Sequence, residues 1–202
     1  FRISELKKGK CPFFEPGIEE LLSKHRDQTK LLSFTSSLPE AMEGADIIFI
    51  TVGTPSKRLE EDADLSAVWN VAKDIANNIK KYTLVVTKST VPVGTTQEIK
   101  KIISKIVPKE NFDVVSNPEF LREGSAINDF MRPDRIIIGT DNEKSTKIMK
   151  ELYRPLYLLE TPIITSSIES SEIIKYASNS FLATKISFIN QVADLCEAVG
   201  AD

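Results

Sequence analysis

Two carboxylates and a guanidinium gather in one short segment, residues 117–125, which reads NPEFLREGS. Glu119 and Glu123 are four positions apart, so in a helix they share one face and repel by roughly a few tenths of a kcal/mol. Asn-Pro favours a turn and a helix start, where the helix dipole partly stabilises acidic groups. Spacing alone therefore leaves two interpretations open: a solvated first turn, or an acid–base site.

Hydroxyl side chains follow a predicted strand in a second segment, residues 88–95, which reads KSTVPVGT. The preceding run at 83–87, TLVVT, is β-branched and typical of a buried strand, and isoleucines recur at helical spacing after it. Ser89 and Thr90 therefore lie in the turn between a strand and a helix. Ligands of open α/β sheets bind at such turns.

A third segment has the same layout. Residues 46–52 form a predicted strand, residues 53–55 form the turn, and residues 63–64 open the next helix. Ordinary strand-to-helix loops also carry Ser, Thr, Gly and Pro for turn chemistry, so one such loop means little. Several of them at strand ends in one chain favour a nucleotide or a phosphorylated ligand.

The composition narrows the classes of protein. The 202 residues have a net charge of −3 and a pI near 5.4, so no global basic field attracts nucleic acid. No apolar run approaches the roughly 20 residues that span a bilayer. His25 is the single histidine and Cys11 and Cys196 are the two cysteines. We therefore expect no metal site, no membrane segment, and a reducing, cytoplasmic setting.

Repeated strand–helix alternation must position these loops. We predict strands at 46–52, 83–87, 112–116, 135–139 and 162–165, and helices at 16–26, 65–80, 95–106, 142–153 and 167–199. This order indicates an α/β fold with a parallel sheet.

The predicted helix at 167–199 is unusually long and is apolar on more than one face. Such a helix joins two domains or forms a subunit interface. Lys175 and Asn179 are four apart on it and share a face. Most lysines are solvated, so a solvated Lys175 stays open at this point.

Four segments together resemble the nucleotide-sugar 6-dehydrogenases: VGTP at 52–55, KSTVPVGT at 88–95, NPEFLREG at 117–124 and KYASNSFLATKISFIN at 175–190. EPG at 15–17 and PDR at 133–135 also fit. The resemblance covers almost the whole chain. It implies NAD as the cofactor and UDP-glucose as the substrate, with two hydrides passing to two NAD molecules as the 6-hydroxymethyl becomes a carboxylate.

The resemblance also implies the site residues. Those of the NAD site are Val52, Gly53, Thr54, Pro55, Ser56, Ser89, Thr90 and Glu123. Those of the sugar site are Glu119, Phe120, Leu121, Arg122, Glu123, Lys175 and Asn179. Lys175 and Asn179 suit an oxyanion, Thr90 suits a bound water, Glu119 suits a general base toward water, and Glu123 suits positioning of cofactor and substrate.

Some family features are missing. No Gly-x-Gly-x-x-Gly turn occurs, so we expect an incomplete Rossmann-like sheet at 1–165 that lacks its first βαβ elements, followed by the start of a central connecting and dimerisation helix at 166–202. The chain begins without Met and stops within a helical pattern, so we expect a fragment that is inactive alone. The nucleophilic cysteine is expected beyond residue 202, and Cys196 is expected to be a small buried hydrophobe.

Two alternatives remain. A related enzyme could act on GDP-mannose or a UDP-N-acetylhexosamine, and the acidic residue that would distinguish NAD from NADP is not in the chain. From another class, the chain could be a non-catalytic nucleotide-binding or assembly module. A homodimer is expected for the enzyme, because the long helix carries apolar faces.

Overall fold

A five-stranded sheet organises the chain. The computed structural model describes residues 2–55, 63–157 and 161–201. The strands are β1 (Ile47–Ile50), β2 (Thr83–Thr87), β3 (Phe112–Ser116), β4 (Ile136–Gly139) and β5 (Ile163–Ser166), and they lie side by side in that order. β2 is buried along its whole length, as its β-branched run predicted.

The predicted α/β fold with a parallel sheet is confirmed, and one pair of neighbouring strands departs from the parallel arrangement. β1, β2 and β3 run parallel, and β4 and β5 run parallel, but β3 and β4 are antiparallel and pair through Ser116 and Gly139. The start of β4 therefore runs beside the segment that follows β3. A run of isoleucines specifies a buried strand but not its direction, which is why the sequence did not reveal the reversal.

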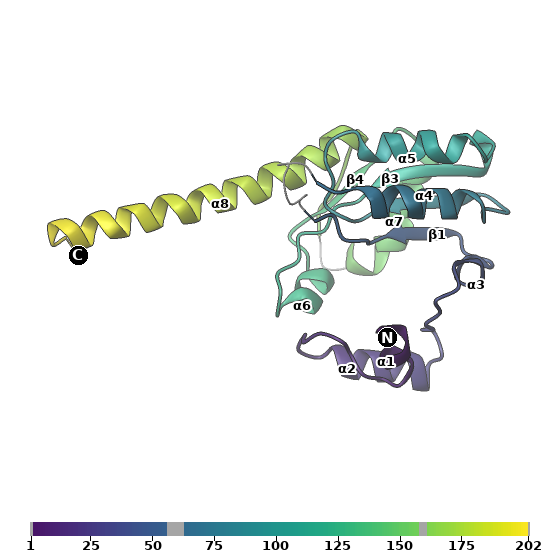
Figure 1. Cartoon of the computed structure of the whole chain (residues 1–202), viewed down its shortest axis with the longest axis horizontal. Coiled ribbons are helices and arrows are strands. Elements are labelled where there is room, and N and C mark those ends of the chain that lie inside the picture. Colours follow the sequence, from purple (N-terminus) through teal and green to yellow (C-terminus); the bar gives the residue numbers. More distant parts are fainter. Residues whose placement is uncertain (1, 56–62, 158–160, 202) are drawn as a thin grey trace.

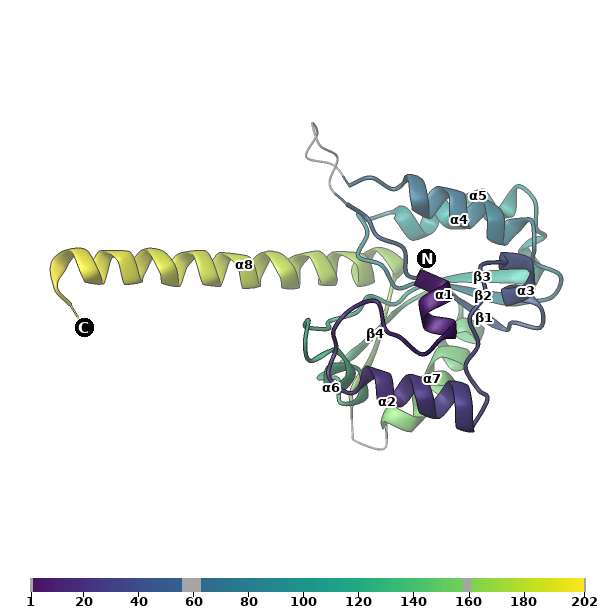
Figure 2. The ribbon, with the colours of Figure 1, turned by 60° about the horizontal axis from the view of Figure 1, so that its bottom comes forward.

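Helices cover both faces of the sheet (Figures 1 and 2). α4 (Ser66–Ala76) and α5 (Thr95–Ser104) pack on one face, where they share a core with β1, β2 and β3. α7 (Glu143–Tyr157) packs on the other face through Met149, Tyr153 and Leu156. Leu84 and Val86 of β2 point to the α7 side, and Val85 points to the α4–α5 side, as strand alternation requires.

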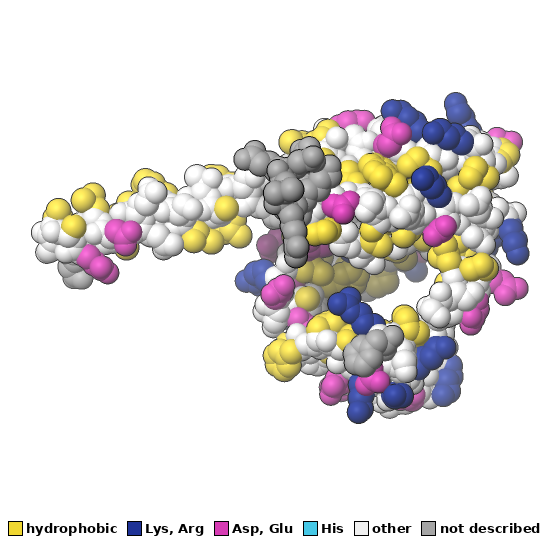
Figure 3. All heavy atoms as spheres, in the orientation of Figure 1, with side chains coloured by type: hydrophobic (Ala, Val, Ile, Leu, Met, Phe, Trp, Pro, Cys, Tyr) yellow, Lys and Arg dark blue, Asp and Glu magenta, His cyan; other side chains and the backbone are white. Residues whose placement is uncertain are grey.

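Short helices that the sequence did not predict surround this core. They are α1 (Arg2–Lys7), α3 (Leu38–Met42) and α6 (Ala126–Met131), together with a 3₁₀ turn at Lys109–Asn111. The predicted helix at 16–26 is divided into α2 (Ile18–Ser23) and a π-helix (Lys24–Gln28). α1 and α2 form a unit set apart from the sheet, and Figure 3 shows an opening between the two.

α8 (Ile168–Val199) is a single helix of 32 residues. Ser167 begins it by accepting a hydrogen bond from the Ser170 N–H at 3.1 Å. Its first turns pack on β4 so closely that Gly139 has no room for a side chain. The rest of the helix projects from the body as a straight rod (Figure 1). Within the described residues, no helix combines the length and apolar character needed to cross a membrane.

Candidate active site

A cavity of about 800 Å³ opens at the edge of the sheet where β2 and β3 end. Because β4 runs antiparallel to β3, the start of β4 lies at this edge as well. The loop after β3, α6, α7 and α8 supply the remaining walls. Segments far apart in the sequence therefore meet here, at the kind of strand-end position where α/β proteins bind ligands.

An ion pair between a buried lysine and a partly exposed glutamate lies on one wall of this cavity. The Lys175 Nζ of α8 is 3.2 Å from the Glu119 Oε1 in the loop after β3, and Lys175 is only 6% exposed. The other carboxylate oxygen of Glu119 accepts a 2.6 Å hydrogen bond from the Leu121 N–H. Lys175 Nζ also lies 5.1 Å from the centroid of the Phe120 ring. Both partners are thus held in place, and Lys175 is not a solvated lysine.

Aromatic and cationic groups continue the wall. The guanidinium of Arg135, just before β4, stacks 4.3 Å from the centroid of the Phe120 ring. The same guanidinium donates to the Ser178 hydroxyl of α8 at 3.4 Å. Phe120 therefore lies between cations from two different elements, which ties the loop after β3 to the start of β4 and to α8.

Lys88, directly after β2, also lines the cavity and has two neutral partners. Its Nζ lies 3.3 Å from Asn117 Oδ1 and 3.4 Å from the Tyr153 hydroxyl. Burial lowers the pKa of Lys88 to about 8; Glu119 raises it and Lys175 lowers it further. Burial also raises the pKa of Tyr153 to about 12, so this phenol stays protonated near neutral pH.

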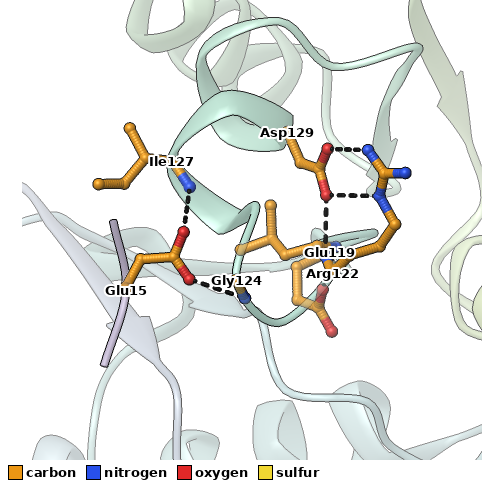
Figure 4. Close-up of polar contacts among 7 residues, drawn as sticks. Glu15, Glu119, Arg122, Gly124, Ile127 and Asp129 are labelled. Atoms are coloured by element: carbon orange, nitrogen blue, oxygen red, sulfur yellow. Dashed lines mark hydrogen bonds and ion pairs between the residues drawn. The ribbon is translucent and has the colours of Figure 1, made fainter. Parts of the chain in front are cut away.

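The turn between Glu119 and α6 is held from outside by the N-terminal unit (Figure 4). Glu15, which is 8% exposed, accepts hydrogen bonds from the Gly124 N–H at 3.1 Å and the Ile127 N–H at 3.4 Å. Arg122 forms a two-pronged pair with Asp129 of α6, at 3.1 and 2.7 Å. The conformation of this turn therefore depends on residues more than a hundred positions apart in the chain.

The predicted sugar-site residues do not all reach the cavity. Those that line it are Glu119, Phe120, Leu121, Arg122, Lys175 and Asn179. Glu123 is exposed and is not among the lining residues. The structure adds Lys88, Asn117, Tyr153 and Arg135. Lys88 stood in a segment already singled out by its place after a strand, whereas nothing in the helical pattern around Tyr153 marked that residue.

The predicted cofactor residues form a second group, in the loops after β1 and β2. The Ser89 hydroxyl donates to the Val52 carbonyl at 2.7 Å, and the Thr54 hydroxyl donates to the Thr90 carbonyl at 2.8 Å. These two bonds fasten the loops to each other. Gly53 is exposed between them, with open space where a side chain would be. Ser56 lies outside the described residues.

Glu172 of α8 links the two groups. It is 1% exposed, and its carboxylate accepts hydrogen bonds from the Gly94 N–H at 2.7 Å and the Thr96 N–H at 2.8 Å. It thus caps α5, whose first turn follows the Ser89–Thr90 loop. Helical spacing also allows Glu172 to pair with Lys175, three positions along. In the structure, Glu172 instead bonds to the start of α5, and Lys175 pairs with Glu119.

No group of three or more His, Cys, Asp or Glu side chains that could hold a metal ion occurs in the described part of the chain. Cys11 and Cys196 are both free thiols, and Cys196 is half-buried within α8. The residues that line the cavity supply carboxylate, ammonium, amide and hydroxyl groups, which suit proton transfer and the stabilisation of an oxyanion.

Known proteins match this chain in sequence. Residues 1–157 match the NAD binding domain of the UDP-glucose/GDP-mannose dehydrogenase family, and residues 169–202 match the central domain of that family. The chain is 52% identical to the UDP-glucose 6-dehydrogenase of Rhizobium meliloti (strain 1021) and 50% identical to the UDP-glucose 6-dehydrogenase YwqF of Bacillus subtilis (strain 168). The matches cover 100% of this chain and 46% and 45% of those proteins.

Solved structures agree with the sequence matches. The GDP-mannose dehydrogenase of Pseudomonas aeruginosa superposes with a TM-score of 0.93 at 37% identity, over 100% of this chain and 47% of that one. The UDP-glucose dehydrogenase of Pyrobaculum islandicum gives 0.92 at 39% identity, over 99% and 46%. The chain spans about half the length of the curated relatives it matches. With both of its segments matched in order, the chain belongs to the UDP-glucose/GDP-mannose dehydrogenase family.

Proposed function

We propose that the protein carrying this chain oxidises the C6 hydroxymethyl of UDP-glucose to a carboxylate with NAD. The observation that supports it best is the ion pair between the buried Lys175 and Glu119 in the wall of an 800 Å³ cavity. The oxidation removes two hydrides from one carbon and takes one oxygen from water. It therefore needs a cation where negative charge develops on oxygen, and a base that can accept a proton from water.

Each residue of the pair suits one of these tasks. The Lys175 ammonium is fixed by Glu119 and faces the cavity, so it can stabilise an oxyanion without reorganising. Asn179 lines the same cavity one turn further along α8 and offers an amide donor. Glu119 has one oxygen on Lys175 and one on a backbone N–H, which places it to take a proton from a water in the cavity.

The loops after β1 and β2 fit the cofactor. They lie at the carboxyl ends of parallel strands, they are fastened to each other, and Gly53 leaves their surface open. We assign Val52, Gly53, Thr54, Pro55, Ser89 and Thr90 to the NAD site, with Glu123 and the undescribed Ser56 as further members of the set. When bound, NAD accepts the hydride. Thr90 would hold a water between the two groups.

The organisation of the longer protein is also a proposal. Residues 1–165 would serve as the cofactor domain, and residues 166–202 as the helix that connects domains and forms a homodimer. The exposed apolar side chains of α8 support this role. A cytoplasmic setting is supported by the two free thiols.

An absorbance assay of NADH formation tests the proposal. The full-length protein that carries this chain is expected to reduce NAD in the presence of UDP-glucose and to release a UDP-sugar acid, detected by mass spectrometry. GDP-mannose and a UDP-N-acetylhexosamine serve as competing substrates. Faster turnover of either one would reassign the substrate. Binding without turnover of any of them would instead favour a non-catalytic module.

A further inference from the structure

Lys88 is a partly buried cation that forms no ion pair with a carboxylate among the described residues. Its Nζ contacts the Asn117 amide oxygen and the Tyr153 hydroxyl, and it lies 5.9 Å from the centroids of both the Phe130 and Tyr153 rings. Among the described residues, none forms an ion pair with it, whereas Lys175 nearby is paired with Glu119. Removing an ammonium from water without a counter-charge is unfavourable. Such a group therefore calls for an explanation beyond packing.

The partners of Lys88 are themselves locked. The Tyr153 hydroxyl donates to Asn117 Oδ1 at 2.6 Å, so its lone pairs are left to accept from Lys88. The Asn117 Nδ2 donates to the Ile137 carbonyl at 2.7 Å, which fixes the amide with its oxygen toward Lys88. An ammonium has three N–H donors, and these two acceptors engage two. The third remains for the cavity that Lys88 lines.

The cavity as a whole carries excess positive charge. Three acidic side chains line it among the described residues: Glu119, Asp129 and Asp134. Six basic side chains line it: Lys88, Arg122, Arg132, Arg135, Lys175 and Lys185. Arg132 and Lys185 are exposed, whereas Lys88 and Lys175 lie deeper. The exposed cations suit the phosphates of a nucleotide. The two deeper lysines, Lys88 and Lys175, are then available to a second anionic group.

We propose that Lys88 is an anion-binding residue that recognises the carboxylate formed at C6, in a cradle made by Asn117 and Tyr153. This inference rests on the proposed function. Lys175 is already neutralised by Glu119, so a second negative charge arriving in the cavity needs a second cation. Lys88 supplies it, and the substrate alcohol, which is neutral, makes no such demand. Lys88 thus distinguishes the oxidised end of the sugar from the reduced end.

Two ligands that differ only at C6 test the proposal. The dissociation constants of UDP-glucuronate and UDP-glucose are measured by calorimetry for the full-length protein and its Lys88→Met variant. Because the two ligands share the same nucleotide, the ratio of their dissociation constants cancels any effect of a substitution on nucleotide binding. Lys88→Met is expected to weaken UDP-glucuronate at least about tenfold more than UDP-glucose, as for a buried charged contact. Lys88→Arg, which keeps the charge, is expected to keep the ratio within about threefold.

The pH dependence supplies a readout that a merely structural role would not move. The charged groups that act on Lys88 are Glu119 and Lys175, and Tyr153 stays protonated because its pKa is about 12. Lys88 is charged below its pKa of about 8 and neutral above it. In the wild type, the preference for UDP-glucuronate is therefore expected to fall as the pH rises through 8. In Lys88→Met the ratio is expected to change less.

The outcomes separate the two proposals. Lys185→Met removes an exposed cation of the same cavity, so it is expected to weaken both ligands by one common factor. If Lys88→Met also weakens both equally, or if Lys88→Arg behaves like Lys88→Met, Lys88 does not recognise the carboxylate and only this inference fails. If the wild type binds neither ligand, both the proposed function and this inference fail.

Discussion

At the level of single residues, two lysines of the cavity differ in their partners. Lys175 is buried and paired with a carboxylate, whereas Lys88 is partly buried and contacts neutral groups. Paired charges give a fixed geometry, and an unpaired charge gives affinity for whatever anion enters. The two lysines are therefore expected to respond differently to substitution, Lys175 in the rate of reaction and Lys88 in binding and stability.

Replacement of Lys175 tests its proposed catalytic role. In the full-length protein, Lys175→Ala is expected to lower kcat by on the order of 10²-fold, comparable to losing one oxyanion donor, with a smaller change in KM. Steady-state kinetics with UDP-glucose and NAD measure both constants. Lys185→Ala, on the exposed part of the same helix, is the matched control and is expected to change kcat far less. An unchanged kcat in Lys175→Ala would remove Lys175 from the chemistry.

The lowered pKa of Lys88 predicts how the free energy of unfolding depends on pH. Its pKa is about 8 in the folded protein against an ordinary value of 10.5, so between these values the unfolded chain binds more protons. The cost of the buried charge is fully present below pH 8 and is relieved as the pH rises toward 10.5. Lys88→Met is thus expected to be more stable than the wild type at pH 7, by a margin that shrinks by pH 10. Urea unfolding at the two pH values measures this difference.

Several residues that the sequence singled out line the cavity, but the sequence did not show how they are arranged. It placed Glu119, Lys175 and Asn179 together through a family resemblance, and all three line the cavity. It left open whether Lys175 pairs with Glu172, because helical spacing allows that pair. The choice depends on contacts between α8, α5 and the loop after β3. Such contacts join residues more than fifty positions apart, and no local pattern encodes them.

At the level of elements, the site depends on how α8 is seated. The contacts that hold its beginning include the close approach to Gly139 of β4 and the hydrogen bonds that Glu172 accepts from the start of α5. Strands β2 and β3 were predicted with their observed bounds because short runs rich in apolar and β-branched residues are typical of strands. The packing position of α8 could not be predicted from the sequence, because it depends on the reversed direction of β4 and on Gly139.

Gly139→Ala tests the seat at the strand. A Cβ at this position would overlap the Ser171 Cβ and lie 2.8 Å from the Ser167 carbonyl oxygen, so the helix must move. We expect a loss of about 1–3 kcal/mol in the free energy of unfolding, as for an overpacked core. Gly53→Ala is the control, because a Cβ there meets nothing within 4 Å. Equal stability of the two variants in urea would contradict the close packing.

Glu172→Ala tests the seat at α5. The substitution leaves the Gly94 and Thr96 N–H groups without their acceptor, at a cost of about 1–3 kcal/mol for each group that stays buried. Glu172→Gln offers one oxygen in place of two, so an intermediate loss is expected. Urea unfolding measures the loss, and faster hydrogen exchange at Gly94 and Thr96 would locate it. Unchanged exchange at both amides would rule out the cap.

At the level of the whole molecule, α8 exposes large apolar side chains on several sides beyond the body. They are Phe181, Leu182, Ile186, Phe188, Ile189, Leu195 and Val199. Figure 3 shows apolar atoms on both edges of the projecting helix. A helix of this character is stable in water only when other surfaces cover it. The sequence predicted the long helix with apolar residues on more than one face, because the distribution of apolar residues around a helix is a local pattern.

Ile189→Glu tests the proposed assembly. Ile189 is 59% exposed in the isolated chain, so a charge there costs little unless another apolar surface covers it. In the full-length protein we expect the variant to shift a homodimer toward monomer in sedimentation-velocity experiments. Asn190→Glu places the same charge on the neighbouring, already polar position and is expected to have a smaller effect. A wild-type protein that sediments as a monomer at every concentration would exclude the homodimer.

The rod-like form of α8 also has a mechanical consequence. The helix is clamped near Ser171, which lies about 6 Å from Lys175 and about 42 Å from Val199 along the axis. A rigid rod pivoting at the clamp would move these points in a ratio of about one to seven. A swing of ~7 Å at the far end thus displaces Lys175 by ~1 Å, an error that can cost on the order of 10²-fold in rate. Any surface that binds the distal end of α8 therefore controls the position of the Lys175 ammonium group, tens of ångströms away.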